Sequence, residues 1–323
     1  MISLSKTYLT SIEDLSEDEI LNLITRAIEF KRNKDGKSNK QALDGKTLAL
    51  MFEKPSTRTR LSFETAMFQL GGNTIYLNAN DLQVSRGESM QDTAKTVSLY
   101  VDCLVARVYS HDTIVKLAQN CKIPVINGLS DLYHPCQVLA DLMTILEHKK
   151  RFKGLTLAWV GDGNNVCNDL LIGSAKMGIN IKAAIPRGYE PPQEILKIVT
   201  HESKLRETDF AIVREPIDAV KNADIVVTDT FVSIGKENED DIRRSIFIPK
   251  YQVNGKLMGS SKDDAIFMHC LPAKRGEEVT SDVIDGNKSV VWDEAENRLH
   301  VQKSLLVSLL DLAKEIFYLN FIW

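Results

Sequence analysis

Short apolar runs alternate with segments of helical periodicity along almost the whole chain. Apolar runs of strand length occur at residues 47–52, 74–77, 102–106, 124–127, 156–160, 181–185, 223–228, 265–268 and 289–292. Between them apolar residues recur three and four positions apart. In the first such segment a capping box at Ser16 is followed by Ile20, Leu23, Ile24, Ala27 and Ile28.

This alternation continues through both halves of the chain. It predicts an α/β protein with two doubly wound parallel-sheet domains that face each other across a cleft. The basic residues and the glycine of 150–154 precede a new strand and mark the boundary between the domains. In open parallel sheets ligands bind outside the carboxyl ends of the strands, so polar residues that follow the apolar runs are the candidates for a site.

The clearest candidate is the segment 52–64, where the first apolar run leads into a helix. Pro55 ends the run, and a helical pattern opens at Ser56. A helix N-terminus offers unpaired N–H groups and the positive end of the helix dipole, which attract an anion. Hydroxyl and guanidinium side chains occupy the same turn: Ser56, Thr57, Arg58, Thr59 and Arg60. They predict a phosphate-binding site, and the alternative is a capped helix with surface arginines.

Two further strand ends in the first half carry polar side chains. Arg107 follows the run 102–106, while His134 and Gln137 flank the start of a helix that has Pro135 in its first position. The alternatives are a solvated arginine and a structural histidine. The polar segment 78–87, which contains Gln83, is long for a connection, and such loops tend to be functional or to meet a neighbour.

In the second half the strand 156–160 ends in Gly-Asp-Gly-Asn-Asn at 161–165. This sequence resembles half of a dinucleotide fingerprint, but Val166 stands where the third glycine should fall, and no acidic residue closes the strand 181–185. The amides of Asn164 and Asn165 instead suit the backbone of an amino acid.

Two later strands also deliver polar groups. Asp229 ends the strand 223–228, and His269 and Cys270 follow the strand 265–268; Asp229 and Cys270 could accept or orient the proton of an amine. A small buried hydrophobe is the alternative for Cys270. A zinc site is a further alternative, although its spacing matches no common pattern of ligands; it would use His134, Cys136, His269 and Cys270. The charge-rich stretch 230–250 is interpreted as a mobile lid.

Composition narrows the class of protein. The 323 residues suit two domains, and 43% hydrophobic with 26% charged residues is typical of a soluble chain. A net charge of -4 argues against a general nucleic-acid binder. Charged residues interrupt the apolar segment 305–323, which is therefore interpreted as a packed helix and not as a membrane span. Residues 1–10 contain no apolar signal segment, and five irregularly spaced cysteines indicate a reduced, cytoplasmic protein.

Four motifs occur in a characteristic order: Ser-Thr-Arg-Thr-Arg at 56–60, His-Pro-Cys-Gln at 134–137, Gly-Asp-Gly-Asn-Asn at 161–165 and His-Cys-Leu-Pro at 269–272. With them the chain resembles the ornithine carbamoyltransferases of the aspartate/ornithine carbamoyltransferase family over nearly its whole length. Cys270 separates the ornithine type from the aspartate type. The resemblance implies a carbamoyl phosphate-binding domain of residues 1–148, on which the C-terminal helix 300–323 packs back, and an ornithine-binding domain of residues 149–299.

The resemblance also implies the reaction. The side-chain amine of L-ornithine would attack the carbonyl carbon of carbamoyl phosphate and give L-citrulline and phosphate, a step of arginine metabolism and arginine biosynthesis that needs no cofactor and no metal. The family assembles as homotrimers or multiples of trimers, with active sites at subunit borders. The expected partners are these small-molecule substrates and further copies of the chain, without nucleic acid or membrane.

Transferred position by position, the resemblance implies the site residues. Catalytic roles would belong to Arg58, Arg107, His134, Asp229 and Cys270. Carbamoyl phosphate would be bound by Ser56, Thr57, Arg58, Thr59, Arg107, His134, Gln137, Cys270, Leu271, Arg298 and, from the neighbouring subunit, Gln83. Ornithine would be bound by Asn165, Asp229, Ser233 and Ile234.

One motif departs from the family pattern. The lid motif is usually Asp-x-Trp-x-Ser-Met-Gly, whereas this chain has Phe231 for the tryptophan and Ile234 for the methionine. Lid closure and the choice of amine are therefore open. The rival interpretations are a putrescine-type carbamoyltransferase, a nucleotide-dependent oxidoreductase built on the Gly161 turn, and a non-catalytic anion-binding or assembly protein. Retention of Ser233 and Gly235 with an acid at 229 favours an amino acid as the acceptor.

Overall fold

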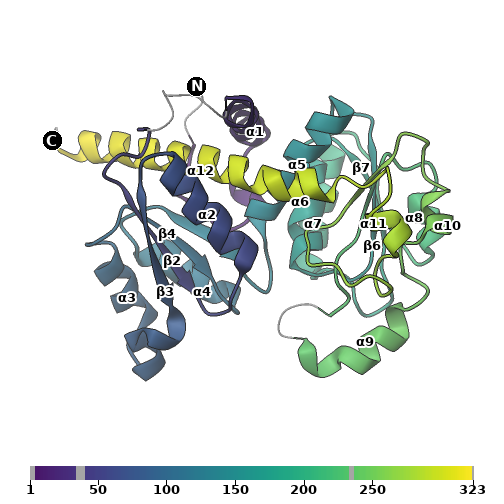
Figure 1. Cartoon of the computed structure of the whole chain (residues 1–323), viewed down its shortest axis with the longest axis horizontal. Coiled ribbons are helices and arrows are strands. Elements are labelled where there is room, and N and C mark those ends of the chain that lie inside the picture. Colours follow the sequence, from purple (N-terminus) through teal and green to yellow (C-terminus); the bar gives the residue numbers. More distant parts are fainter. Residues whose placement is uncertain (1–3, 34–40, 233–235, 322–323) are drawn as a thin grey trace. The chain divides into compact units, whose positions relative to one another are not determined.

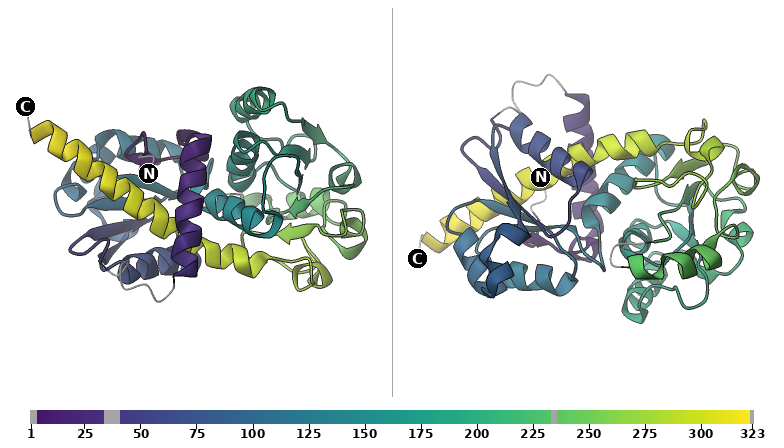
Figure 2. Two further views of the ribbon diagram at one scale, coloured as in Figure 1. Left: turned by 90° about the horizontal axis from the view of Figure 1, so that it is seen from above. Right: turned by 60° about the horizontal axis from the view of Figure 1, so that its bottom comes forward.

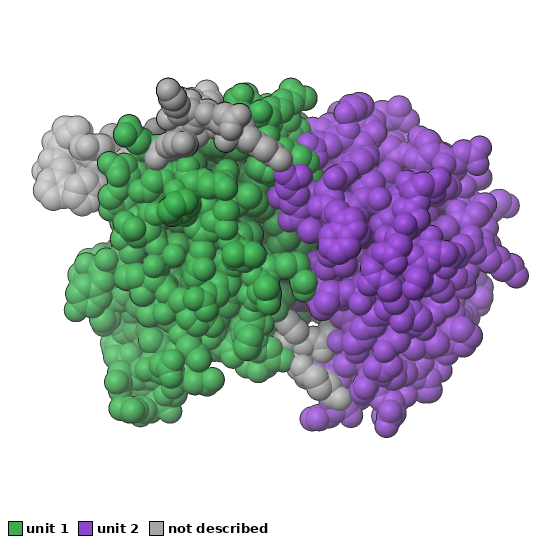
Figure 3. All heavy atoms as spheres, in the orientation of Figure 1, with its two compact units in different colours: residues 1–140, 297–323 green, residues 141–296 purple. Residues whose placement is uncertain are grey.

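The computed structural model describes residues 4–33, 41–232 and 236–321 (Figure 1). The chain divides into two compact units, residues 1–140 with 297–323 and residues 141–296, which Figure 3 colours green and purple. The first unit therefore combines both ends of the chain, and the second is its middle. Both unit boundaries fall inside helices, α5 (Pro135–Lys149) and α12 (Val291–Phe321).

Among the described residues the first unit contains a parallel sheet of five strands in the order β1-β5-β4-β2-β3. The strands are β1 (Tyr8–Leu9), β2 (Thr47–Phe52), β3 (Asn73–Asn78), β4 (Cys103–Arg107) and β5 (Val125–Leu129). Strand β2 pairs with β3 on one side and with β4 on the other. The direction of winding therefore reverses between β2 and β4.

Helices and short 3₁₀ turns connect these strands. They are η1 (Ile12–Asp14), α1 (Glu17–Arg32), α2 (Thr57–Gln69), η3 (Ala79–Asp81), η4 (Gln83–Arg86), α3 (Met90–Val97) and α4 (His111–Asn120). Helices α3 and α4 cover one face of the sheet, where Met51 and Leu104 share an apolar cluster with Ala94 and Leu117. Helix α1 lies across α12 in both views of Figure 2, and Arg26 Nη1 donates to Ser308 Oγ at 3.2 Å.

The second unit, as far as it is described, has a parallel sheet in the order β10-β9-β6-β7-β8. Its strands are β6 (Thr156–Val160), β7 (Asn180–Ala184), β8 (Phe210–Val213), β9 (Ile225–Val227) and β10 (Ile266–Met268). Strand β6 pairs with both β7 and β9, so the winding reverses between β6 and β9. The remaining elements are α6 (Asn165–Lys176), α7 (Gln193–Leu205), α8 (Pro216–Val220), η5 (Glu237–Glu239), α9 (Asp240–Phe247), α10 (Gly255–Met258) and α11 (Ser281–Ile284).

The predicted class, α/β with two doubly wound parallel sheets, is confirmed. Residues 297–321 of α12 belong to the first unit. The prediction of a last strand at 289–292 is wrong. Ser289 makes only an isolated bridge with Phe267, and α12 begins at Val291. Asp293 and Glu294 in the first turn of α12 stabilise a helix start there, which outweighs the strand preference of a short apolar run.

The sequence pattern does not predict the short strands β1 and β8, because two and four residues give too little pattern to recognise. The predicted lid stretch 230–250 contains η5 and α9, while its Ser233, Ile234 and Gly235 lie outside the described residues. Within the described part of the chain, we find no helix with both the length and the apolar character that crossing a membrane requires.

Candidate active site

In the first unit the carboxyl ends of three strands are neighbours. Phe52 at the end of β2 is paired with Arg107 at the end of β4, and Arg107 is paired with Leu129 at the end of β5. The segments that follow β2 and β5 lead to Ser56 and to His134. The predicted residues therefore follow the carboxyl ends of neighbouring strands, next to the point where the winding of the sheet reverses. Ligands usually bind there in this architecture.

The first turn of α2 has the predicted character. Ser56 is the N-cap, and its Oγ accepts a hydrogen bond from Thr59 N at 3.4 Å. Thr57 is exposed, Arg58 is half-buried and Thr59 is buried. Hydroxyl groups and a guanidinium thus surround the positive end of the helix dipole, an arrangement suited to an anion.

Arg60 does not contribute to this turn as the sequence predicts. Its Nε donates to Glu64 Oε1 at 2.9 Å, one helical turn further on, and its guanidinium lies 3.9 Å from the ring centroid of Tyr76. The spacing of four residues favours this pair on the helix surface. Of the two arginines in the motif, Arg58 is the one left as a candidate for binding an anion.

A buried arginine from the far end of the chain joins the predicted residues. Arg298 of α12 donates from Nη2 to Thr59 Oγ1 at 3.0 Å and from Nη1 to Gln137 Oε1, and Nη1 lies 3.4 Å from His134 Nε2. All four residues are at most 5% exposed. We call Thr59, His134, Gln137 and Arg298 the arginine cluster. It brings together α2, α12 and the start of α5 inside the first unit.

His134 is uncharged in this cluster. Burial, together with the positive charges of Arg298 and Arg107, lowers the pKa of His134 well below its ordinary value. A neutral imidazole carries one ring proton, and because Arg298 donates toward Nε2, that proton lies on Nδ1. His134 is therefore a neutral hydrogen-bond donor beside cationic arginines.

Gln83 is placed differently from the other residues predicted for carbamoyl phosphate. It stands on η4 within the predicted polar segment, and its side chain is exposed. It is therefore not part of the buried arginine cluster.

In the second unit the same sheet geometry recurs. Trp159 of β6 and Met268 of β10 are both paired with Val227 of β9, so three carboxyl ends lie together. Asn164 follows β6, Asp229 follows β9, and His269 and Cys270 follow β10. The winding reverses between β6 and β9, which places these residues at the ligand edge of this sheet.

Asp229 is the centre of this second group. Its Oδ2 accepts from Asn164 Nδ2 at 2.7 Å, and its Oδ1 accepts from Cys270 Sγ at 3.2 Å and from Thr230 N at 2.7 Å. The Oδ1 atom of Asn164 also caps α6 by accepting from Cys167 N at 3.0 Å. We call Asn164, Asp229 and Cys270 the aspartate cluster.

The two asparagines of the 161–165 motif have different surroundings. Asn164 binds Asp229, whereas Asn165, predicted for ornithine, is the first residue of α6, and its Oδ1 accepts from Val166 N at 3.1 Å. The sequence suggests both asparagines for an amino acid, and the resemblance implies only Asn165. Its N-cap position ahead of an apolar helix is the signal that identifies it.

The Cys270 thiol is protonated at neutral pH. Burial is the largest cause that raises the pKa of Cys270 well above its ordinary value, and the negative charges of Asp229 and Glu294 add to it. Cys270 therefore donates a hydrogen bond to Asp229 and does not accept a proton. The sequence predicts that Cys270 accepts or orients the proton of an amine. Of these two roles, orienting fits this geometry, because the thiol holds Asp229.

His269 supports the backbone beside Cys270. Its Nδ1 accepts from Leu271 N at 2.9 Å, and its Nε2 lies 3.2 Å from Glu278 Oε1, which also accepts from Lys274 N at 2.6 Å. Leu271 has a φ of 57°, in the left-handed region that residues other than glycine rarely adopt. The imidazole thus stabilises an unfavourable conformation at Leu271. The sequence does not reveal this role, because nothing marks Glu278 as the partner of His269.

These groups already use the atoms that a metal ion would need. Among the described residues, ligand atoms of Asp229, His269 and Cys270 lie within 4.8 Å of one another. Nδ1 of His269 accepts from Leu271 N, Nε2 of His269 faces Glu278 Oε1, and Asp229 accepts from Cys270 Sγ, so each group of the set has a protein partner. In the alternative zinc set, Cys136 is buried and its Sγ donates to the carbonyl oxygen of Asn127 at 3.5 Å.

The glycine at 163 has a structural explanation that does not involve a nucleotide. A Cβ atom added there would lie 2.5 Å from both Pro191 N and Tyr189 O, and Gly163 N donates to Tyr189 O at 2.9 Å. Glycine is therefore required for the close approach of the neighbouring loop.

Two residues predicted for ornithine, Ser233 and Ile234, lie outside the described residues.

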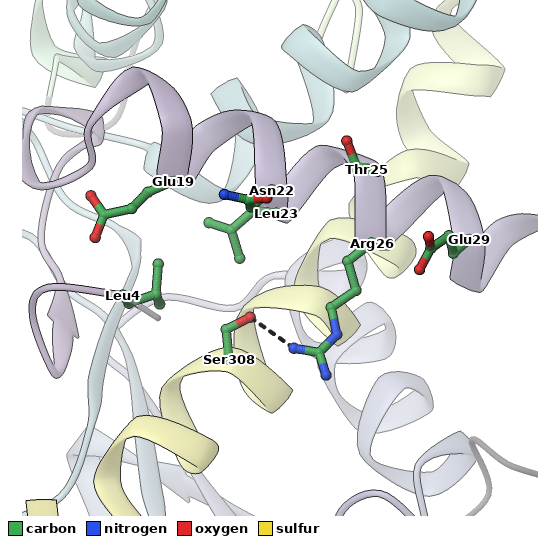
Figure 4. A pocket seen from close by; sticks show the side chains of 8 residues that line it. All are labelled: Leu4, Glu19, Asn22, Leu23, Thr25, Arg26, Glu29 and Ser308. Carbon is green, nitrogen blue, oxygen red and sulfur yellow. Dashed lines mark hydrogen bonds between the residues drawn. The ribbon is translucent and has the colours of Figure 1, made fainter. Parts of the chain in front are cut away.

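A cavity of the first unit lies between α1 and α12 (Figure 4). Two of its charged side chains, Arg26 and Glu19, have protein partners. Arg26 donates to Ser308 and lies 3.8 Å from an oxygen of Asp311, and Glu19 accepts from the backbone N–H groups of Ser5 and Ser16. The cavity is lined by Leu4, Glu19, Asn22, Leu23, Thr25, Arg26, Glu29 and Ser308. Its contacts explain how α1 is held, and they indicate no chemistry.

Two family models match the chain. The model for the carbamoyl-P binding domain of aspartate/ornithine carbamoyltransferase matches residues 8–147. The model for the Asp/Orn binding domain of the same family matches residues 153–309.

Individual relatives match over nearly their full length. An ornithine carbamoyltransferase of Cenarchaeum symbiosum is 56% identical over 94% of this chain and 98% of its own. A Pyrococcus furiosus protein named as an anabolic ornithine carbamoyltransferase is 50% identical over 95% of this chain and 97% of its own. The solved structure of an ornithine carbamoyltransferase from Pyrococcus furiosus has a TM-score of 0.90 and 49% identity, and covers 95% of this chain and 97% of that chain.

The neutral state of His134 predicts a dependence of stability on pH. The pKa is lowered in the folded chain, so the unfolded chain binds a proton that the folded chain does not, and the free energy of unfolding falls as the pH drops below the ordinary histidine value. Between pH 7 and about pH 5.5 this loss amounts to about 1 kcal/mol. We expect His134→Asn to lose less stability than the unmodified protein over this range, by urea denaturation.

The control is His201→Asn, which removes an exposed imidazole of α7. It should follow the unmodified protein at both pH values. An equal acid-induced loss in His134→Asn and His201→Asn would contradict the neutral assignment.

Proposed function

Since the chain belongs to the aspartate/ornithine carbamoyltransferase family, we propose that it transfers the carbamoyl group of carbamoyl phosphate to the side-chain amine of L-ornithine and releases L-citrulline and phosphate. The resemblance inferred from the four motifs is thereby confirmed. The observation that carries the proposal is the contrast between the two clusters at the strand ends. The arginine cluster suits a phosphate dianion, and the aspartate cluster suits an ammonium group.

Carbamoyl phosphate is assigned to the first unit. Arg58 and the α2 N-terminus would hold the phosphate oxygens, and Arg107 would contact the carbonyl end. The remaining contacts are Ser56, Thr57, Thr59, His134, Gln137 and Arg298, with Cys270, Leu271 and a neighbouring subunit's Gln83 completing the site. Arg298 contributes twice, because it is a cation and also orders Thr59 and Gln137 by direct hydrogen bonds.

His134 would stabilise charge on the carbonyl oxygen. As the amine nitrogen bonds to the carbonyl carbon, negative charge develops on that oxygen, and a neutral imidazole N–H can donate to it without first losing a proton. Phosphate then departs with the electrons of the C–O bond. The reaction needs alignment of two substrates and support for developing charge, which the arginines and His134 can supply.

The nucleophile is the more demanding part of the reaction. An alkyl amine like that of lysine loses its proton near pH 10.4, so its uncharged form costs about 4 to 5 kcal/mol at pH 7. Asp229 would attract the ammonium group and orient it, with Asn164 and Cys270 holding the carboxylate by hydrogen bonds. Ornithine would also contact Asn165, Ser233 and Ile234. The ammonium group loses one proton before it attacks, through Asp229, and the nitrogen loses a second as the C–N bond forms, which the departing phosphate accepts.

Assembly and pathway are part of the proposal. A homotrimer, or a multiple of trimers, would let exposed Gln83 reach a neighbouring subunit's site, and large exposed apolar side chains of the first unit support association. The most exposed of them are Leu61, Phe68, Leu99 and Tyr100. A cytoplasmic enzyme of arginine biosynthesis fits the anabolic name of the Pyrococcus furiosus relative.

Phe231, one of the two departures in the lid motif, is a core residue. Its ring is 1% exposed and stacks on Phe247 with centroids 4.8 Å apart. Phenylalanine for tryptophan at this position is therefore a change of packing in the second unit. It gives no reason to prefer putrescine over ornithine.

The proposed reaction predicts citrulline formation from carbamoyl phosphate and ornithine by the purified protein. Ornithine should be preferred over putrescine and over the amino acids one carbon shorter and longer, because Asp229 and the lid motif select both ends of the substrate. A colorimetric ureido assay measures each product. Preference for putrescine would identify the other carbamoyltransferase type, and inactivity with every amine would favour a non-catalytic protein.

Removal of Arg107 should weaken carbamoyl phosphate binding. Loss of a charge-assisted contact costs about 2 to 3 kcal/mol, which raises the dissociation constant by about 30- to 150-fold. Titration calorimetry of Arg107→Gln measures this change. Arg60→Gln, which removes an arginine paired with Glu64, should bind like the unmodified protein. An unchanged dissociation constant in Arg107→Gln would remove Arg107 from the site.

Replacement of Cys270 should affect ornithine far more than carbamoyl phosphate. Cys270→Ala removes the donor to Asp229, while Cys270→Ser keeps a donor and should retain part of the activity. Steady-state kinetics with each substrate varied measures the difference. Cys121→Ala, at the end of α4 in the first unit, is the control. Equal impairment for both substrates would contradict the assigned role of Cys270.

A further inference from the structure

Arg243 of α9 connects two of the three loops that carry the aspartate cluster. Its Nη1 donates to Asp162 Oδ2 at 2.7 Å and to the carbonyl oxygen of Phe231 at 3.1 Å. Asp162 lies two residues before Asn164, and Phe231 lies two residues after Asp229. One guanidinium therefore joins the loop after β6 to the loop after β9, close in sequence to the Asn164–Asp229 hydrogen bond.

This connection is buried and geometrically specific. Arg243 is 5% exposed and Asp162 is 6% exposed. The Nε atom of Arg243 donates to Glu239 Oε2 at 2.8 Å, and its guanidinium lies 5.0 Å from the ring centroid of Tyr189. On the other side of the pair, Trp159 Nε1 donates to the carbonyl oxygen of Asp162 at 3.0 Å. A planar fork of donors can satisfy these directions together, whereas a lysine ammonium cannot.

The contact between α9 and the loop after β9 has a polar part, made by Arg243, and an apolar part, made by Phe247. The Phe231 ring stacks on Phe247, so part of the contact between α9 and the loop after β9 is apolar and does not depend on Arg243. Removal of one partner of a buried ion pair destabilises a protein, because the other charge stays buried without its partner, whereas replacement of both partners is often nearly neutral. Arg243→Gln should therefore lower stability as well as loosen the two loops, and a double replacement of Arg243 and Asp162 should separate the two effects.

We propose that Arg243 is a positioning residue for the amino-acid substrate. Through Asp162 and Phe231 it sets the distance and direction between Asn164 and Asp229, and hence the direction in which the carboxylate meets the amine. Arg243 touches no reacting atom. The inference rests on the proposed function, since it concerns the ornithine half of the site.

The test compares two adjacent arginines of α9. Arg244 forms ion pairs with Asp240 and Glu277, both at 2.6 Å, and none of its described partners belongs to the two loops. Arg243→Gln should raise the KM for ornithine by about tenfold or more, with the KM for carbamoyl phosphate changed by less than about twofold. Arg244→Gln should change neither KM by more than about twofold.

Two conservative variants keep the test valid if Arg243→Gln folds poorly. Arg243→Lys retains a cation for Asp162 but cannot also satisfy Phe231 and Glu239, so an intermediate KM for ornithine is expected. Asp162→Asn should raise the KM for ornithine in the same direction. The double variant Arg243→Gln/Asp162→Asn should be no worse than the poorer single variant, because both remove one connection.

The inference is overturned if Arg243→Gln and Arg244→Gln give the same KM for ornithine, or if Arg243→Gln impairs both substrates equally. Thermal melting of each variant separates loss of folding from loss of positioning. Failure of the proposed function would appear differently, as absence of citrulline with the unmodified protein. The two failures are therefore distinguishable in one set of assays.

Discussion

The hydrogen bonds of the Arg298 guanidinium are the interaction on which the first half of the site depends. A buried cation is tolerated only when its N–H groups find partners, and Thr59 and Gln137 are held in place as those partners. Burial, together with this charge and that of Arg107, keeps His134 neutral. Arg298 of α12 therefore contributes both to order at the N-terminus of α2 and to the protonation state of the adjacent histidine.

The second half of the site follows the same architectural rule with the opposite charge. Each sheet reverses its winding once, between β2 and β4 and between β6 and β9, and each reversal brings polar residues from separate loops together. In one case the central group is a guanidinium, and in the other it is the Asp229 carboxylate. Protein donors surround that carboxylate, so it is oriented before any amine arrives.

Features carried by local pattern could be predicted from the sequence. Apolar runs, caps and Pro55 give the strand–helix alternation and the residues at the strand ends, including Ser56, Arg107 and Asp229. Features made by distant pairs could not be predicted from pattern. Arg298 and Thr59 are in contact although they lie 239 positions apart in the sequence. No local pattern identifies the partners of His269 or of Arg243 either. At 289–292 the short apolar run predicts a strand, but the acidic first turn of α12 favours a helix there.

The division of the chain into units has a consequence for its synthesis. The second unit is one continuous stretch, residues 141–296, and all of its strands have left the ribosome before α12 is complete. The first unit is made earlier for the most part, but its Arg298 and the helix against which α1 packs belong to residues 297–323, which are made after the second unit. The middle of the polypeptide can therefore reach its native packing before the beginning does, contrary to the usual order from N-terminus to C-terminus.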